Sequence, residues 1–344
     1  MQHKPNRRDM LKRLGLGGAA AAAAAAIPGA ILPGSARAAT PAADAPASPA
    51  PPSRFLRIAH LTDLHIQPER DAAEGVAQCL RHVQSHAHKV DLILVTGDCI
   101  MDAFAQDHAR TQLQWDLWQR VWKQENSLPV RIALGNHDIW GWNKPASKTS
   151  GSEPGWGKQW ACDVVGLEKP YHSFNHGGWH FVALDSVFPF NETSYTAKLD
   201  DGQFDWLERD LAAVDPQTPV LIMSHIPIIS VTPMFSKPVD EPDVGTLLRH
   251  GSMHQDWRRL RTLFAKHPNV KLAISGHTHQ LDRVDTNGVS YLCNGAVSGG
   301  WWRGRHLDEC DAGYALLDLH PDGTFTRQYQ TYNWTYRPDP APAG

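Results

Sequence analysis

From Phe55 onward, the chain alternates short apolar runs with longer amphipathic stretches, and this alternation restricts the possible folds most strongly. Six runs are rich in Val, Ile and Leu and bounded by polar or glycine residues, as buried strands are: residues 55–61, 92–96, 130–134, 182–185, 220–224 and 271–275. Between them, apolar residues recur at helical spacing in residues 72–88, 106–124, 201–214 and 254–266. The order predicts an α/β sandwich with helices outside a central sheet.

The C-terminal third follows a different pattern, in which turn dipeptides separate apolar strands. Asn287-Gly288 lies between residues 281–286 and 289–293, and Asp322-Gly323 lies between residues 313–320 and 324–331. Asn-Gly and Asp-Gly favour the tight turns of β-hairpins. We therefore expect antiparallel hairpins at the C-terminus. Because no linker or repeat interrupts residues 54–335, we expect them to form one domain.

The first 38 residues have the pattern of an export signal. Arg7 and Arg8 precede an uncharged Ala- and Gly-rich stretch, and a small-residue cleavage site follows at residues 36–38. Paired arginines are typical of twin-arginine signals, whose machinery exports folded proteins. A membrane anchor is the alternative, but Ala and Gly make the stretch weakly hydrophobic. We expect a periplasmic or secreted mature protein without a transmembrane span, with disordered Ala/Pro-rich segments at residues 39–53 and 336–344.

The composition excludes some functions and suggests others. The net charge is -3, so Lys and Arg do not outnumber Asp and Glu, and no nucleic-acid-binding surface is evident from the sequence. The 19 histidines suggest metal or acid–base chemistry. The five cysteines are an odd number with no CxxC pair, which leaves both one disulfide and free thiols open.

Five short polar motifs each stand directly after a predicted strand. They are Asp63-Leu64-His65, Gly97-Asp98, Gly135-Asn136-His137-Asp138, Ser224-His225 and Gly276-His277-Thr278-His279. In an open α/β sheet, loops at one end of the strands converge on one crevice. Their mixed carboxylate and imidazole side chains suit Fe, Mn or Zn rather than Ca or Mg.

Taken together and in this order, the five motifs resemble those of the calcineurin-like metallophosphoesterase family, over residue 55 to about residue 334. The resemblance implies a four-layer αββα sandwich with mixed sheets and a centre of two divalent or trivalent metal ions. It implies one ion held by Asp63, His65, Asp98 and His279. The other would be held by Asp98, as the bridge, with Asn136, His225 and His277.

The resemblance also implies a reaction in which a hydroxide bridging the two ions attacks phosphorus and His137 acts as general acid. In the protein-phosphatase branch of the family, an Asp three residues beyond the bridging Asp steadies this histidine. Here Met101 occupies that position and Asp102 follows it. Asp102 and Asp138 are therefore both candidates for the role.

That branch also places an Arg directly before the GNH motif, where this chain has Leu134. The difference argues against a protein serine/threonine phosphatase. The short GNHD and GHTH motifs are closer to the branch that contains cyclic-nucleotide phosphodiesterases.

A glycine-containing loop after the last motif supplies candidate substrate residues. Trp301 and Trp302 could stack on a base or sugar, and Arg303 could pair with a phosphate. Packing of the loop onto the domain is the alternative for all three residues.

The sequence therefore predicts a dinuclear-metal hydrolase of a small organic phosphate ester, with a diester favoured. A phosphomonoesterase of the same fold is one alternative. A catalytically silent periplasmic metal-binding protein is another, but all seven ligand positions and His137 are present, which disfavours it.

Overall fold

The computed structural model describes residues 55–235, 239–241, 245–304 and 310–337. The expected signal at residues 1–38, the linker at 39–53 and residues 338–344 of the expected tail lie outside the described residues. Export and the boundaries assigned to these segments therefore stay predictions.

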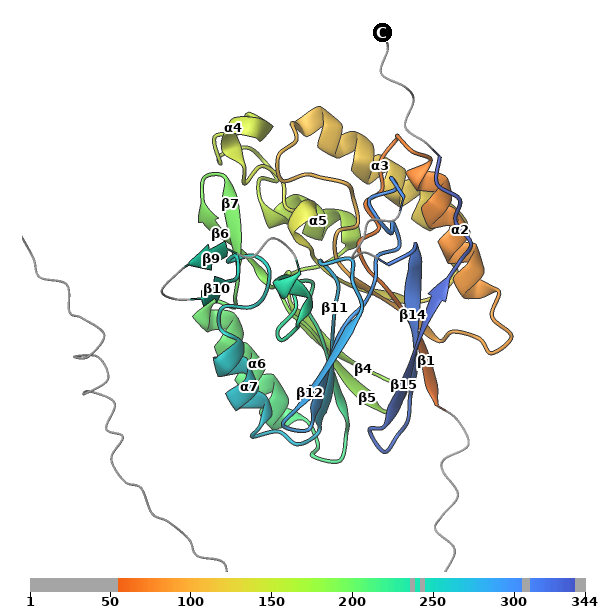
Figure 1. Cartoon of the computed structure of the whole chain (residues 1–344), viewed down its shortest axis with the longest axis vertical. Helices are drawn as coiled ribbons and strands as arrows, with labels where there is room; N and C mark the ends of the chain where they lie inside the picture. The colour runs from red at the N-terminus through yellow and green to blue at the C-terminus, as the bar shows by residue number, and fades with distance from the viewer. Residues whose placement is uncertain (1–54, 236–238, 242–244, 305–309, 338–344) are drawn as a thin grey trace, which may run out of the picture. The chain divides into compact units, whose positions relative to one another are not determined.

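Two mixed β-sheets form the centre of the described chain (Figure 1). The first has the order β15-β14-β1-β2-β3, with β1 Leu56–Leu61, β2 Leu92–Thr96, β3 Val130–Ala133, β14 Gly313–Leu319 and β15 Phe325–Thr331. The second has the order β12-β13-β11-β8-β5-β4, with β4 His172–His176, β5 Trp179–Ala183, β8 Val220–Met223, β11 Val270–Ser275, β12 Asp282–Thr286 and β13 Val289–Cys293. Strands β1, β2 and β3 are parallel, as are β5, β8, β11 and β13.

The two sheets pack face to face over one apolar layer. Ile58 and Leu94 of the first sheet belong to the same buried cluster as Phe181, Met223 and Ile274 of the second. Because both faces of these strands are buried, their sequences read as continuous apolar runs rather than as alternating ones. This explains why the sequence pattern located β1, β2, β5, β8 and β11. The sixth predicted strand, β3, is also present, although its Arg131 is exposed.

Helices cover the outer face of each sheet. Helices α2, Ala72–Gln84, and α3, His108–Glu125, share a buried cluster with the first sheet, and α6, Asp201–Ala213, and α7, Trp257–Phe264, share one with the second. Asp107 and Asp200 begin α3 and α6 by accepting backbone N–H groups. The predicted four-layer sandwich and both C-terminal hairpins are confirmed, and each of the four predicted helices is present with bounds that differ by a few residues.

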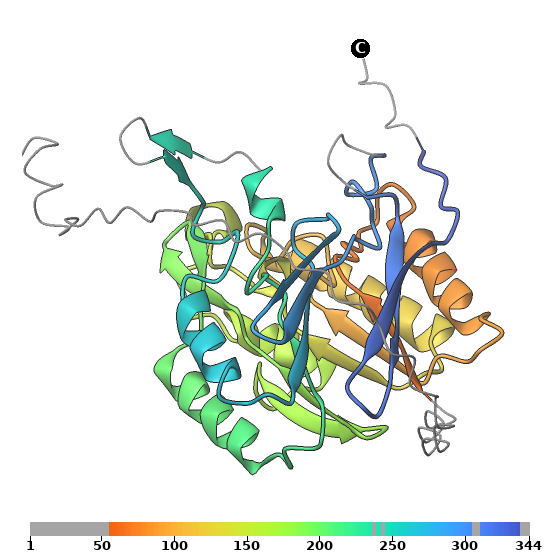
Figure 2. The same ribbon diagram turned by 60° about the horizontal axis from the view of Figure 1, so that its bottom comes forward.

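Several short elements were not predicted from the sequence. They are β4, helices α4 (Lys144–Ser147) and α5 (Lys158–Val165), the turns η2 (Asn136–Asp138) and η3 (Thr232–Met234), and the hairpins β6–β7 (Val187–Asn191 and Ser194–Ala197) and β9–β10 (Val239–Glu241 and Gly245–Leu247). Figure 2 shows the β9–β10 hairpin extending away from the sheets. These elements are too short and polar to give a periodic signal.

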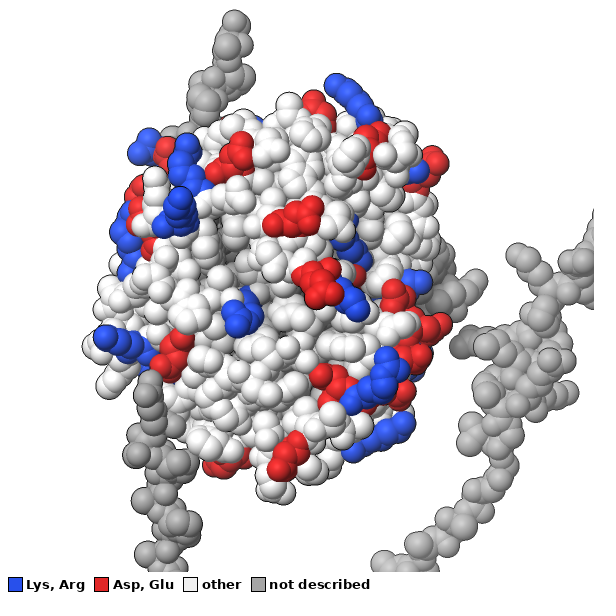
Figure 3. Space-filling view, turned by 180° about the vertical axis from the view of Figure 1, so that it is seen from behind, with Lys and Arg blue, Asp and Glu red and all other residues white. Residues whose placement is uncertain are grey.

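Surface and core features bear on the remaining expectations. Among the described residues, no helix combines the length and apolarity needed to cross a membrane. Cys79, Cys99, Cys162 and Cys293 are buried thiols outside any disulfide. On the face seen in Figure 3, acidic and basic side chains are interspersed between wide uncharged areas.

Candidate metal centre

The five motif loops meet at one edge of the two sheets, on sharply turned backbone. Five of the seven predicted ligands have positive φ angles: Asp63 (52°), His65 (45°), Asp98 (53°), His277 (71°) and His279 (57°). Non-glycine residues rarely adopt this conformation, and it is concentrated at functional sites. The motif glycines permit the crowding, since a Cβ at Gly135 would overlap Asp98 and one at Gly276 would overlap Asp63.

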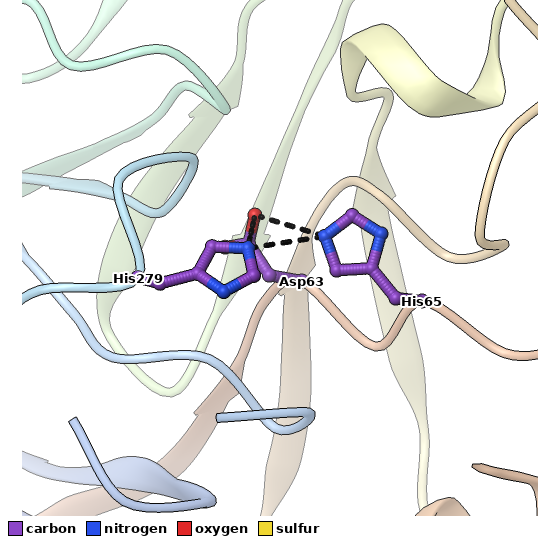
Figure 4. A group of neighbouring side chains, drawn as sticks. All are labelled: Asp63, His65 and His279. Atoms are coloured by element: carbon purple, nitrogen blue, oxygen red, sulfur yellow. Dashed lines mark hydrogen bonds and ion pairs between the residues drawn. The ribbon is translucent and has the colours of Figure 1, made fainter. Parts of the chain in front are cut away.

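The first group of potential ligands consists of Asp63, His65 and His279, all buried (Figure 4). Asp63 Oδ1 lies 3.7 Å from His65 Nε2 and 3.4 Å from His279 Nε2, and the two Nε2 atoms are 3.1 Å apart. Asp63 Oδ1 is buried without a hydrogen-bond partner. A carboxylate and two imidazoles converging in this way form a binding site for a cation.

The second group consists of Asp98, His225 and His277. Asp98 Oδ2 lies 3.3 Å from His225 Nε2 and 3.7 Å from His65 Nε2 of the first group. Asp98 therefore stands between the two groups, as a bridging carboxylate must. Asn136 Oδ1 lies 3.0 Å from His225 Nε2, so it joins the second group.

Surrounding hydrogen bonds orient these side chains. His279 Nδ1 donates to Gly299 O at 2.7 Å, and His225 Nδ1 donates to Thr96 O at 2.6 Å. Each bond leaves the Nε2 atom directed at the centre, which is the arrangement found in metal-binding histidines. Asp63 Oδ2 accepts the His277 N–H at 2.9 Å, so Oδ1 remains available to a cation.

The pKa values of His65 and His277 also fit metal binding, whereas burial at His225 is outweighed by Asp98 and Asp63, which raise its pKa to about 9. Burial lowers the pKa of His65 to about 4 and that of His277 to about 3, which keeps both imidazoles in the neutral form that binds metals. Burial raises the pKa of Asp98, but the facing imidazoles outweigh it and hold that pKa below its usual range. The residues present therefore fit two ions, each with mixed oxygen and nitrogen ligands.

His137 lies beside the centre, half-buried. Its backbone N–H donates to Asp98 Oδ1 at 2.8 Å, and its ring atom Nδ1 lies 3.5 Å from Asp102 Oδ1. Burial lowers the pKa of His137, but Asp98 and Asp102 outweigh burial and raise it. Of the two carboxylates that the sequence left open as partners of His137, Asp102 is the one placed against the imidazole.

Asp138 has a different environment. Its carboxylate accepts the backbone N–H groups of Asp98, Cys99 and Gly135 at 2.8–3.0 Å. Burial and the charge of Asp98 raise the pKa of Asp138 to about 7. Asp138 thus joins the GD and GNHD turns, and this geometry does not support the catalytic role assigned to it from the sequence.

The three predicted substrate residues separate into distinct environments. The Trp301 ring lies 3.9 Å from that of His65, 4.7 Å from that of His279 and 5.1 Å from that of His137 (centroid distances). Trp302 is fully buried and donates its indole N–H to the backbone oxygens of Leu64 and His65, so it is inaccessible to a substrate. Arg303 is exposed.

A buried polar layer that the five motifs do not include lies beneath the centre. His60 Nε2 lies 2.8 Å from Thr96 Oγ1, and Asn294 Nδ2 donates to His60 Nδ1 at 2.6 Å. Thr62 Oγ1 donates to Asp63 Oδ2 at 2.7 Å. Thr62 and Thr96 each come directly before a motif. This position in the sequence could have identified them as neighbours of the metal ligands.

A four-layer sandwich that brings two such ligand groups to one edge defines the chain as a metal-dependent phosphoesterase. The sequence pattern described as Calcineurin-like phosphoesterase matches residues 56–281. The chain belongs to this family.

Named relatives are similar over most of their length. The 3',5'-cyclic adenosine monophosphate phosphodiesterase CpdA of Escherichia coli is 28% identical over 305 residues, which cover 84% of this chain and 94% of that protein. A probable cyclic nucleotide phosphodiesterase of Synechococcus is 27% identical, with 79% of this chain and 91% of that protein covered. Among solved structures, a dimetal phosphatase from Danio rerio superimposes with a TM-score of 0.56 at 14% identity, covering 81% of this chain and 97% of that one, which supports the fold.

Proposed function

We propose that this chain is a two-metal phosphodiesterase that hydrolyses small organic diesters, including cyclic nucleotides. The observation that carries the proposal is the position of Asp98, whose Oδ2 faces His65 of one ligand group and His225 of the other. Two ions held by these ligand groups would supply an activated water and neutralise charge on the phosphate oxygens. Metals of the Fe, Mn or Zn type match the donor set.

The protein's own groups would act on the leaving oxygen. His137 is anchored through its backbone N–H to Asp98, and its ring nitrogen Nδ1 faces Asp102. A carboxylate beside Nδ1 favours a proton on the imidazole and fixes the ring so that Nε2 can donate to a leaving group. We assign the role of general acid to His137 and that of positioning residue to Asp102.

Two features favour diesters over monoesters. Leu134 stands where a protein phosphatase would have an arginine for the phosphate, so the additional charge of a monoester lacks that partner here. The similar proteins from Escherichia coli and Synechococcus carry names of cyclic-nucleotide phosphodiesterases. A phosphomonoesterase is the competing activity.

Turnover of a matched substrate pair tests the proposal. Purified protein with its metal content measured should hydrolyse bis(p-nitrophenyl) phosphate with a higher kcat/KM than p-nitrophenyl phosphate in the presence of Mn²⁺. A reversed preference would establish the monoesterase alternative. Absence of turnover of either ester by protein that carries two metals would identify a silent metal-binding protein.

We also propose that the protein is exported in folded form to the periplasm or beyond. The support is the sequence pattern of residues 1–38, with Arg7 and Arg8 before a weakly hydrophobic stretch. Replacement of both arginines by lysine should retain the full-length chain in the cytoplasm, as measured by cell fractionation. Unchanged export of this double variant would exclude the twin-arginine route.

A further inference from the structure

A pocket of about 530 Å³ opens beside the second ligand group. It is lined by Ser194 and Tyr195 of β7, by residues 247–252 and by the ligand His277. Backbone hydrogen bonds fix the two sides relative to each other, because Ala197 donates to His250 O at 3.1 Å and Gln255 donates to Ala197 O at 2.8 Å. The pocket is therefore a defined part of the fold, and none of its lining residues was singled out by the sequence motifs except His277.

Tyr195 forms part of the pocket wall beside the metal ligand His277. Its ring packs edge-on against Phe104 at 5.6 Å and faces the edge of His277 at 6.3 Å. Gly251 lies directly against the ring, where a Cβ would come within 2.5 Å of it. Burial and the nearby carboxylates of Asp98 and Asp63 raise the pKa of the Tyr195 phenol, which is consistent with a position close to the metal ligands.

Two exposed apolar side chains lie at this pocket or against its lining. Leu247 is 42% exposed, and Phe190 is 52% exposed while its ring stacks on that of His250 at 4.2 Å. Small-molecule pockets are typically lined by such apolar and aromatic groups with a few polar ones. Arg249, also in the lining, adds a positive charge suited to an anionic diester.

The pocket and the general acid stand against different parts of the centre. His137 lies against His65 and Trp301, whereas the pocket opens on His277, whose ring packs on that of His225. A diester whose leaving oxygen is placed at His137 would therefore hold its other ester arm away from His137. That retained arm would be the part of the substrate that lies towards Tyr195 and Leu247.

We propose that this pocket binds the ester arm that stays on phosphorus and that it selects a planar aromatic group there. The proposal rests on the proposed phosphodiesterase function. Tyr195, His250 and Leu247 would contact the aromatic ring, so they determine specificity and take no part in the chemical step.

Two diesters with the same leaving group isolate the retained arm. Bis(p-nitrophenyl) phosphate retains an aromatic arm and methyl p-nitrophenyl phosphate retains a methyl arm, while both release p-nitrophenol. The wild type should favour the aromatic arm in kcat/KM. In Leu247→Ala, this preference should fall about three- to tenfold, mainly through a higher KM for the diaryl ester. Tyr195→Leu, with metal content verified, should lower the preference in the same way.

Leu113→Ala is the matched control, because Leu113 is 49% exposed on α3 and does not line the pocket. It should leave the preference unchanged. An unchanged preference in both pocket variants, or an equal fall in the control, would overturn the pocket assignment.

A binding measurement separates failure of the pocket from failure of the phosphodiesterase proposal. Diphenylphosphinate and dimethylphosphinate contain no ester bond to hydrolyse. Metal-loaded wild type should bind the diphenyl compound more tightly in calorimetry, and Leu247→Ala should lose this margin. Tighter binding of the diphenyl compound without diester turnover would support the pocket assignment and refute the proposed activity. Diester turnover without any difference in binding would support the activity and refute the pocket assignment.

Discussion

At the scale of single residues, several ligands of the metal centre adopt left-handed backbone conformations that are unfavourable for non-glycine residues. A non-glycine residue in the left-handed region costs on the order of 1 kcal/mol or more. Asp63, His65 and Asp98 all adopt it, and backbone bonds hold them there: Asp63 donates to Gly97 O at 3.1 Å and His65 to Asp98 O at 3.0 Å. The first two motif loops are thus tied to each other before any ion binds.

The proposed acid role predicts a dependence on the leaving group. His137→Ala should lower kcat on cyclic AMP, which expels an alkoxide, by about 100-fold or more. The loss on bis(p-nitrophenyl) phosphate should be much smaller, because p-nitrophenolate is a stable anion that needs no proton. Steady-state kinetics on both substrates measure the difference. His88→Ala, at an exposed position, serves as control and should change neither rate. Equal losses on both substrates would contradict the acid role.

A second residue-scale prediction concerns His60 and acid stability. Burial is the main cause that lowers the pKa of His60 to about 3, with Arg327 adding to the effect and Asp63 opposing it. The unfolded chain protonates this imidazole below about pH 6.5 while the folded chain does not. The contribution of the neutral His60 to the free energy of unfolding is therefore fully present above pH 6.5. It is lost as the pH decreases towards 3, by up to about 1.4 kcal/mol per pH unit.

Urea unfolding of metal-free protein between pH 6.5 and 4.5 measures this slope. The His60→Gln variant should have a slope smaller by up to about 1.4 kcal/mol per pH unit, which corresponds to one proton. This difference in slope does not depend on how the substitution changes stability at pH 7. The comparison uses slopes because the variant also alters the hydrogen bonds to Thr96 and Asn294. Identical slopes in the two proteins would show that His60 does not titrate as inferred.

At the scale of elements, sequence patterns located the continuous apolar strands and the amphipathic helices. The sequence predicted the buried strands β1, β2, β8 and β11 and the polar residues that follow them. These residues could be grouped into one site because the carboxyl ends of parallel strands lie at the same edge of a sheet. Asp102 and Tyr195 could not be assigned in the same way. Asp102 is positioned by a loop through a bond from its backbone to Gln114, and Tyr195 lies on a hairpin whose placement depends on residues 250–255.

The Trp302 environment gives an element-scale prediction for α2. Replacing a helical glycine by alanine usually stabilises a helix by up to about 1 kcal/mol. At Gly75 the new Cβ would overlap the Trp302 ring, so Gly75→Ala should destabilise the protein by about 1–3 kcal/mol. Chemical unfolding measures the change.

Gly202 in α6 provides the control for that change. A Cβ there would meet only Asp200 Oδ1, at an ordinary 3.6 Å. Gly202→Ala should therefore be neutral or slightly stabilising. If both alanine variants shifted stability in the same direction, Trp302 packing would not be the cause.

At the scale of the whole molecule, each ligand group draws on both sheets. Asp63 and His65 follow β1 of the first sheet, while their partner His279 follows β11 of the second. In the other group, Asp98 follows β2 of the first sheet and His225 follows β8 of the second. An ion in either group would therefore link the two halves of the sandwich at the edge where their motif loops meet.

This arrangement predicts that metal ions stabilise the fold as well as the reaction. Free metal at 100 times the dissociation constant of a site should add about 2.7 kcal/mol per site to the free energy of unfolding. Thermal unfolding of the wild type should accordingly shift upward when Mn²⁺ replaces EDTA. Asp98→Ala should lose most of the shift, because Asp98 faces both groups. Asp285→Ala removes a carboxylate that is 57% exposed on β12 and should retain the full shift. An equal shift in Asp98→Ala and wild type would mean that the ions bind elsewhere and that the sheets are not linked through this centre.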